Sequence, residues 1–259
     1  MDRRSAVITG STSGIGAGVA RTLAANGYAI MLNGFGDPDL IEKQRAELAR
    51  ECETPVRYHD ADLSRKDGCA ELIEAAIGEF GSVDILVNNA GIQHVAPIES
   101  FPWDRWDALL AIHLTAAFCT VQSALPSMRS RGWGRIVNIA STHGLVASVG
   151  KAAYVAAKHG LVGFSKVVAL ETAGSGITCN AVCPGWVLTP MVEKQIAARA
   201  KKENIAEAEA ARELLMEKQP SGAFTTVEQI GSLVAFLCTD QASNITGACL
   251  PIDGGWLAQ

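Results

Sequence analysis

Several features are scarce in this sequence, and each scarcity excludes some classes of protein. Its 259 residues include 7 cysteines, which form no Cys-x-x-Cys pair and are odd in number, so a disulfide framework is disfavoured. Charged residues make up only 19% and the formal net charge is -5, so no broad basic surface is available for nucleic acid or anionic lipid. We therefore expect reduced thiols, a cytoplasmic protein and a small-molecule ligand, with no nucleic acid and no metal.

The chain also lacks a long apolar run at its beginning. Met1 to Ser5 is polar and charged, and the apolar run that follows soon meets Gly10, unlike a signal peptide or a membrane span. No Pro/Gly-rich linker and no internal repeat divides the sequence. Because 48% of the residues are hydrophobic, the chain can bury a full core. We expect one domain over residues 1–259, without membrane association.

Short β-branched runs alternate with longer amphipathic stretches, the pattern of βαβ units around a parallel sheet. The predicted strands are Ala6–Thr9, Tyr28–Asn33, Val56–His59, Val83–Asn88, Arg135–Ala140, Ile177–Val182 and Ala248–Ile252. The predicted helices lie near 15–25, 39–52, 66–79, 104–129, 152–172, 189–217 and 227–238. The pattern predicts an α/β fold, a single Rossmann-like domain whose doubly wound sheet has seven parallel strands and helices on both faces. Ligands of such sheets bind at the carboxyl ends of the strands.

The segment 199–218 differs from the other predicted helices because it is crowded with Ala, Glu and Lys and has few large apolar residues. It can be a solvated helix. It can also be a mobile cap over the site, since short polar helices with little buried surface open at a small cost in free energy. We place the boundaries of such a helical cap near 189–218.

Glycines spaced G-x3-G-x-G follow the first predicted strand, in Thr9-Gly10-Ser11-Thr12-Ser13-Gly14-Ile15-Gly16. Glycine lets the backbone turn tightly and approach a pyrophosphate, and the free N–H groups of the next helix face the phosphates. An ordinary strand-to-helix turn is the alternative for this loop alone. Its place directly after the first strand favours dinucleotide binding.

Two further loops lie where this sheet would bind a dinucleotide. In Asp60-Ala61-Asp62-Leu63, an Asp at a strand end, Asp62, can accept a hydrogen bond from an adenine amino group, and Leu63 follows it. In Asn88-Asn89-Ala90-Gly91, the small residues after Asn89 permit close contact with the cofactor. Either segment alone is a weak signal, but both fall at the predicted crevice.

The end of the second predicted strand, Asn33-Gly34-Phe35-Gly36, bears on the choice between NAD and NADP. A 2′-phosphate calls for Arg or Lys there or within the glycine loop, and neither segment contains one. The usual ribose-binding Asp is also missing directly after this strand, so NAD is favoured by the absence of a phosphate clamp. Asn33 could bond the ribose and Phe35 could lie against the adenosine, while loop and packing roles are equally open.

Tyr154 and Lys158 lie four residues apart on a predicted helix and therefore on one face of it. A free phenol has a pKa of about 10, but a lysine charge beside it favours ionisation, so Lys158 would make Tyr154 a usable base. Ser141 ends the fifth predicted strand, and its hydroxyl could hold a substrate oxygen during proton transfer. A lone Ser at a strand end is more often a turn or N-cap residue, but the ordered set of motifs favours catalysis.

These motifs together resemble the short-chain dehydrogenase/reductase family, from the first strand to Asp253-Gly254-Gly255-Trp256. The resemblance implies nicotinamide-dependent hydride transfer, catalysis by Ser141, Tyr154 and Lys158, and a homotetramer. It also implies that Lys158 anchors the nicotinamide ribose next to Tyr154. The residues that would border the nicotinamide are Pro184, Gly185, Val187 and Thr189.

The family usually has an Asn on the helix after the fourth strand, and this chain has His113 there. In the family this Asn helps position a water that links the lysine to solvent. Because histidine can also pass protons, we hypothesise that His113 preserves the relay with altered pH dependence. The alternative is a histidine packed in the interior, with another group holding the water.

Further segments are similar to bacterial members of the family that oxidise D-3-hydroxybutyrate to acetoacetate. They are Asn33-Gly34-Phe35-Gly36-Asp37, Gly91-Ile92-Gln93-His94, His143-Gly144-Leu145-Val146-Ala147, Cys183-Pro184-Gly185-Trp186-Val187, Val192-Glu193-Lys194-Gln195-Ile196 and Glu217-Lys218-Gln219-Pro220. By this resemblance the substrate carboxylate would be held by Gln93, His143, Lys151 and Gln195, and Trp186 would form the wall near the methyl group. Charge-assisted donors in a partly dry pocket suit such a carboxylate. Taken singly, these residues have ordinary surface or packing roles.

Two other interpretations of the function remain open. Another chemistry of the same family, on a different hydroxy acid or on a 3-oxoacyl thioester with NADPH, is disfavoured by the missing phosphate clamp and by Lys151 and His143. A non-catalytic nucleotide-binding protein is disfavoured by the intact Ser141, Tyr154 and Lys158.

Overall fold

The computed structural model describes residues 3–259, which form a parallel sheet with the strand order β3-β2-β1-β4-β5-β6-β7. The strands are β1 (Ser5–Ile8), β2 (Ala29–Asn33), β3 (Val56–His59), β4 (Ile85–Asn88), β5 (Gly134–Ile139), β6 (Ile177–Pro184) and β7 (Cys249–Ile252). Strand order reverses between β1 and β4, which are paired in parallel. The predicted doubly wound sheet of seven parallel strands is confirmed, and its switch point lies at the β1–β4 pair.

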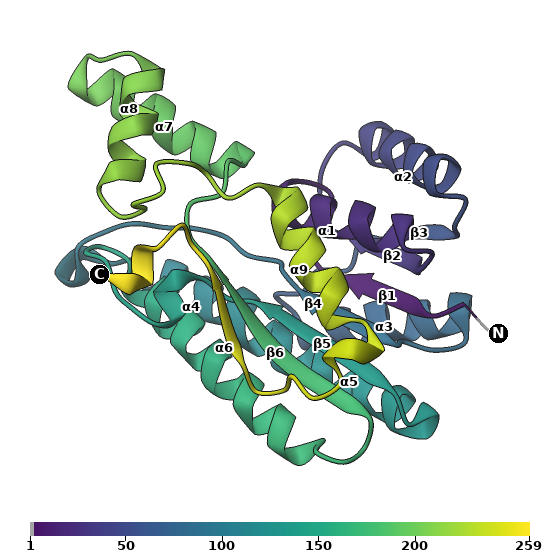
Figure 1. Ribbon diagram of the computed structural model, residues 1–259. Helices are drawn as coiled ribbons and strands as arrows, with labels where there is room; N and C mark the ends of the chain where they lie inside the picture. The colour runs from purple at the N-terminus through teal and green to yellow at the C-terminus, as the bar shows by residue number, and fades with distance from the viewer. Residues whose placement is uncertain (1–2) are drawn as a thin grey trace.

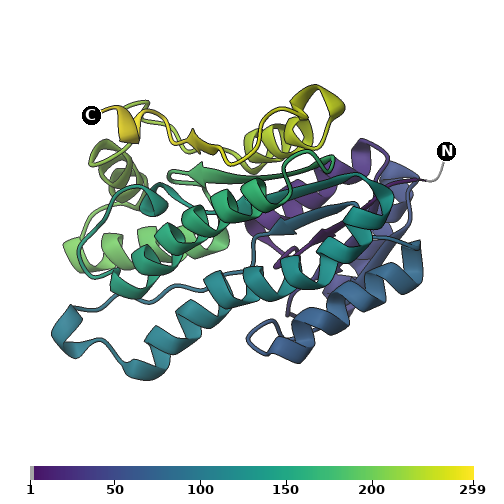
Figure 2. The same cartoon turned by 90° about the horizontal axis from the view of Figure 1, so that it is seen from below.

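Helices cover both faces of the sheet (Figures 1 and 2). One face carries α1 (Gly14–Ala25), α2 (Pro38–Cys52) and α9 (Val227–Leu237), and the other carries α3 (Lys66–Phe80), α5 (Ala116–Arg131) and α6 (Ala152–Glu171). Short 3-10 turns span Ile98–Ser100, Thr142–Gly144, Asp240–Ala242 and Trp256–Ala258. The first strand, β1, and the C-terminal turn Trp256–Ala258 lie toward opposite ends of the molecule in both views.

The core explains why the strands read as nearly continuous apolar runs. Every residue of β1, β2, β4, β5 and β6 is buried, because helices cover the sheet on both sides. Successive side chains alternate between the two cores: Ile8 packs on the α1 and α9 side, whereas Val7 packs on the α3 and α5 side. The buried sheet thus fixes the positions of the strands. The loops after β1, β4, β5 and β6 all lie at the carboxyl ends of the strands.

The helix predicted over 104–129 is interrupted. Helix α4 (Trp103–Leu110) continues through a π-helical turn, Ala111–Thr115, into α5. Among the described residues, the combined helix Trp103–Arg131 is the one long and apolar enough to cross a membrane. In this fold α5 packs against α3 and the sheet. Single π turns inside α-helices occur frequently at functional sites, and this one holds His113.

The cap predicted near 189–218 is a helical hairpin that projects from the body of the molecule (Figure 1). The single predicted helix over 189–217 is wrong: α7 (Pro190–Glu203) ends where Asn204 adopts a left-handed conformation with φ 55, and α8 (Glu207–Met216) folds back. The hairpin has a small core of its own, formed by Val192, Ile196, Ala200 and Ala210. Arg199 of α7 also pairs with Glu203, Glu213 and Glu217, two of which lie on or just after α8.

Candidate active site

The glycine loop after β1 is held against the loop after β4. Gly10 has φ +62, and a Cβ there would lie 2.8 Å from the Cα of Ala90. A Cβ on Gly16 would meet the Gly10 carbonyl and the Asn89 amide. Asn89 Nδ2 donates to the carbonyls of Thr9 and Gly10, both at 2.9 Å, and Thr9 Oγ1 accepts from the N–H of Asn89 at 2.8 Å. The two loops therefore need glycine and asparagine to close on one another.

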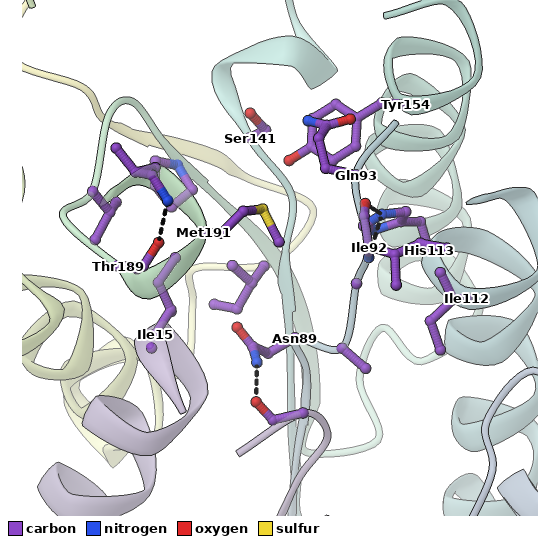
Figure 3. A pocket seen from close by; sticks show the side chains of 18 of the residues that line it. Ile15, Asn89, Ile92, Gln93, Ile112, His113, Ser141, Tyr154, Thr189 and Met191 are labelled. Carbon is purple, nitrogen blue, oxygen red and sulfur yellow. Dashed lines mark hydrogen bonds between the residues drawn. The ribbon is translucent and has the colours of Figure 1, made fainter. Parts of the chain in front are cut away.

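A cavity of about 410 Å³ runs along this edge of the sheet, from the glycine loop to the C-terminal segment. The predicted cofactor residues that line it are Gly10, Thr12, Ser13, Gly14, Ile15, Asn33, Phe35, Leu63, Asn89, Ala90, Gly91, Tyr154, Lys158, Pro184, Gly185, Val187 and Thr189. Figure 3 labels Ile15 at the start of α1 and Asn89 in the loop after β4, together with Thr189 and Met191 from the segment after β6. The structure brings together segments far apart in the sequence at the predicted crevice.

Gly16 and Asp62 are the predicted cofactor residues outside this lining. Gly16 packs behind the loop, as described above. The carboxylate of Asp62 accepts from Ser64 N at 2.9 Å, and its hydrogen bonds with Ser64 lower its pKa. Its neighbours Ala61 and Leu63 line the cavity instead.

Asn33 and Phe35 occupy different parts of the adenosine end. Asn33 is buried, and its Nδ2 donates to the carbonyls of His59 at 3.1 Å and Ala61 at 3.0 Å. Its amide thus ties the ends of β2 and β3 together, which favours the loop role over a bond to the ribose. Phe35 is 66% exposed at the rim of the cavity.

The cavity suits a dinucleotide without a 2′-phosphate. Helix α1 begins at the glycine loop and has no acidic residue in its first turn, so its N–H groups and dipole are free to meet a pyrophosphate. Among the described residues that line the cavity, the lysines and arginines are Lys151 and Lys158, both far from the glycine loop along the chain. Within residues 3–259 there is also no cluster of His, Cys, Asp or Glu that could hold a metal.

Ser141, Tyr154 and Lys158 meet at the carboxyl end of β5. Tyr154 points from α6 toward Ser141 in the cavity (Figure 3). Ser141 Oγ accepts from the N–H of His143 at 3.1 Å. Lys158 is buried, its Nζ donates to the carbonyl of Ile139 at 2.7 Å, and it lies 5.6 Å from the centre of the Tyr154 ring. The spacing of four residues on α6 therefore places phenol and amine together, as predicted.

Burial controls the protonation of these groups. It raises the pKa of Tyr154, although a hydrogen bond with Ser141 acts in the opposite direction. Burial also lowers the pKa of Lys158 to about 7. Desolvation thus raises the phenol pKa, and the charge of Lys158 does not produce the lowering that we expected. At these buried positions, an added positive charge or a hydrogen-bonding ligand would shift the pKa values of both groups strongly.

His113 lies in the π turn and faces the same site. Its ring meets that of Tyr154 edge-on, with centres 5.1 Å apart, and its Nε2 lies 2.8 Å from the carbonyl of Ile92 (Figure 3). A Cβ on Gly91 would collide with the imidazole. Burial and the charge of Lys158 lower the pKa of His113 to about 3. The ring is therefore neutral near pH 7, which argues against a relay that depends on titration of His113 there and favours a role in fixing the loop after β4.

We expect His113→Asn to make the protein less sensitive to acid. The folded state holds the imidazole at a pKa of about 3 instead of 6.5, so the unfolded state binds more protons between these values and stability falls as pH drops below about 6.5. At pH 5 this costs the native protein about 2 kcal/mol relative to neutral pH. Asn does not titrate, so this pH-dependent loss should disappear even where the shorter side chain, which does not extend as far as Nε2, lowers stability equally at both pH values. Denaturant unfolding at pH 7.5 and 5 measures the difference; equal losses in both proteins, or a pH–rate profile shifted by the substitution, would contradict the neutral ring.

Every residue predicted for the substrate lines the cavity. The lining includes Gln93, His143, Lys151, Trp186 and Gln195, and Figure 3 labels Gln93 among them. Lys151 Nζ lies 5.3 Å from the centre of the Trp186 ring, and burial lowers its pKa. Burial also lowers the pKa of His143 to about 4, so this ring is neutral near pH 7.

Trp256 is a cavity residue that the sequence did not identify. Its ring stacks on Trp186 with centres 6.1 Å apart and meets His143 edge-on at 5.4 Å. The motif Asp253-Gly254-Gly255-Trp256 can be recognised in the sequence. The direction of the indole, however, depends on the backbone of Gly254 and Gly255, both of which have positive φ. Together the two tryptophans form an apolar wall next to Lys151.

Comparisons with known proteins agree with this geometry. A family model described as enoyl-(acyl carrier protein) reductase matches residues 10–257. The chain belongs to the short-chain dehydrogenase/reductase family, as predicted. It is 55% identical over 259 residues to D-beta-hydroxybutyrate dehydrogenase of Cupriavidus necator, with 100% of both chains covered. It is 51% identical over 256 residues to the protein of that name from Rhizobium meliloti, with 99% of both covered.

Solved structures show the same architecture. A variant of actinorhodin polyketide ketoreductase with NADPH superimposes with a TM-score of 0.92, at 34% identity, covering 98% of this chain and 97% of the other. Levodione reductase gives a TM-score of 0.90 at 33% identity, with 98% of both chains covered. The fold is therefore shared with reductases of this family that are named for different substrates.

Proposed function

We propose that this protein is an NAD-dependent dehydrogenase that reversibly oxidises D-3-hydroxybutyrate to acetoacetate. The observation that carries the proposal is the end of the cavity next to Ser141 and Tyr154, where Lys151 lies beside the wall of Trp186 and Trp256. A site with one cation and an apolar wall suits a small molecule with a carboxylate and a methyl group. The full-length identity to two D-beta-hydroxybutyrate dehydrogenases supports this substrate.

The residues of this chain account for the proton transfer. Ser141 Oγ bonds the substrate oxygen, and the Tyr154 phenolate takes the proton from the hydroxyl group as the ketone forms. Bound NAD supplies the acceptor for the hydride that leaves the carbon, and its positive ring favours the phenolate. Lys158 is fixed by its bond to the Ile139 carbonyl, which leaves its other N–H groups for the ribose. The carbinol would thus lose a hydride to NAD and a proton to Tyr154, and reduction would reverse both transfers.

The carboxylate end would be bound by Gln93, His143, Lys151 and Gln195. Lys151 supplies the charge, and the neutral His143 and the two amides supply hydrogen bonds. Gln195 lies on α7 of the cap, so a bound acid would draw the cap toward the sheet. The same contacts would disfavour a neutral alcohol, which leaves these groups without a partner.

A turnover panel tests the proposal by following the formation or loss of the reduced nicotinamide cofactor. It compares NAD with NADP, and D-3-hydroxybutyrate with its L enantiomer, lactate and a neutral secondary alcohol, and it adds acetoacetyl-CoA with NADPH in the reverse direction. We expect NAD and D-3-hydroxybutyrate to give the highest kcat/KM. A strong preference for the neutral alcohol would remove the carboxylate site, and preference for the thioester with NADPH would favour the alternative chemistry of the family.

The remaining expectations are part of the same proposal. We propose a single-domain cytoplasmic enzyme that works as a homotetramer, with no nucleic acid, metal or membrane partner. Light scattering of the purified protein measures the assembly size, and a monomer would contradict the tetramer.

A further inference from the structure

We propose that Gln219 is a positioning residue that holds Trp186, and with it the apolar wall of the substrate end, from outside the cavity. Gln219 lies in the Glu217-Lys218-Gln219-Pro220 segment that follows α8, where the chain returns from the cap to the sheet. It is not among the residues that line the cavity. The inference rests on the proposed function, because it takes the wall of Trp186 as the place where the hydroxy acid binds.

The side-chain amide of Gln219 joins two separate segments. Gln219 is 1% exposed. Its Oε1 accepts from the N–H of Trp186 at 2.8 Å, and its Nε2 donates to the carbonyl of Ala223 at 2.5 Å. A buried amide that used neither atom would be costly, so its partners fix its position. The amide thus ties the segment after β6 to the turn that follows α8.

The backbone of Trp186 is held from two sides, whereas its side chain is not held by a hydrogen bond. Besides the bond to Gln219, its carbonyl accepts from the N–H of Thr225 at 2.9 Å. The indole N–H is buried, and within the described part of the chain it has no partner. The ring is in contact with Trp256 and lies below Lys151. The position of this ring therefore follows its backbone, and one of the two bonds that set that backbone comes from Gln219.

Two glycines are shaped around the same side chain. A Cβ on Gly185 would lie 2.5 Å from Oε1 of Gln219, and a Cβ on Gly254 would lie 2.6 Å from its Cγ. Gly185 precedes Trp186, and Gly254 stands two residues before Trp256. Gln219 therefore packs between the segments that carry the two tryptophans. A change in its position would move both halves of the wall.

The test compares variants that keep or remove the two hydrogen bonds. Gln219→Met has a similar length and makes neither bond. Gln219→Glu keeps the acceptor for Trp186, but it donates to Ala223 only when the carboxyl group is protonated, which burial favours. Gln229→Met is the matched control, because Gln229 is exposed and its Oε1 also accepts from a backbone N–H, that of Thr226 at 2.9 Å, at the start of α9.

Kinetics should separate positioning from general loss of structure. We expect Gln219→Met to raise KM for D-3-hydroxybutyrate about tenfold, the size of a lost buried hydrogen bond, while kcat and the Kd for NAD change about twofold or less. For Gln219→Glu, the ratio of its KM to that of the native protein should be smaller at pH 6 than at pH 8. Gln229→Met should keep the native KM at both pH values.

A second readout does not depend on the substrate. The chain has 5 tryptophans, so ¹⁹F NMR of ligand-free protein containing 5-fluorotryptophan reports on each, with Trp186→Phe and Trp256→Phe assigning two of them. Gln219→Met should shift the resonances of Trp186 and Trp256 and leave the three other tryptophan resonances in place. The inference would be overturned if these resonances did not move. It would also be overturned if kcat, KM and the Kd for NAD all worsened by the same factor. Shifted resonances in a protein that does not oxidise D-3-hydroxybutyrate would instead overturn the proposed function alone.

Discussion

Tyr154→Phe is expected to lower kcat by about 10²–10⁴-fold, the range that a general base contributes, while NAD affinity changes little. The variant keeps the ring that packs edge-on against His113 and His143 but loses the oxygen that takes the proton. Lys158 stays fixed to the carbonyl of Ile139, so the cofactor end of the cavity should be preserved. Steady-state rates and fluorescence titration with NADH measure the two effects.

Of the other two tyrosines, Tyr28 provides the matched control for this experiment, because Tyr58 bonds Gly34 at the cavity. Tyr58 Oη donates to the carbonyl of Gly34 at 2.7 Å, and Tyr28 packs against the core on the side of α9. Tyr28→Phe should keep the native kcat, because this ring lies away from the cavity. If Tyr154→Phe turned over at a rate close to the native one, Tyr154 would not be the base.

Lys151→Met is expected to lower kcat/KM for D-3-hydroxybutyrate by about 30- to 1000-fold, mainly through KM. The long apolar side chain can still pack on Trp186, so the main loss is the charge that would face the carboxylate. Because burial lowers the pKa of Lys151, KM of the native enzyme should also rise as the pH passes that pKa and the ammonium loses its proton. Rates with D-3-hydroxybutyrate over a pH series measure both effects.

The neutral secondary alcohol of the panel separates a charge effect from a change of shape. Its kcat/KM should be unchanged or higher in Lys151→Met, since it has no carboxylate to lose a partner. Lys166→Met is a control on the same helix, because Lys166 is exposed on α6. Equal losses for the acid and the alcohol would show that Lys151 shapes the pocket and does not bind the carboxylate.

Local patterns in the sequence were sufficient to predict the strands of the sheet and its glycine loop. Strands covered by helices on both faces are apolar at nearly every position, as in Ile136 and Val137, and each predicted strand overlaps an observed one. The glycine loop, Asn89 and the Tyr154–Lys158 pair are also local, because each works over a few residues in a loop or on one helix face. Breaks inside helices were harder to foresee: Asn204 could have continued a helix, and only the packing of α8 back on α7 requires its left-handed turn.

The sequence by itself determined the parallel sheet, its crevice and the spacing of the catalytic pair, because these depend on periodicity and on contacts between near neighbours. Only the tertiary structure decided what surrounds them. It placed Trp256 on Trp186, put Gln219 behind that wall, and buried His113 so that its pKa falls to about 3. Such features depend on segments that are distant in the chain and on the degree of burial, and neither is encoded in the neighbours of a residue.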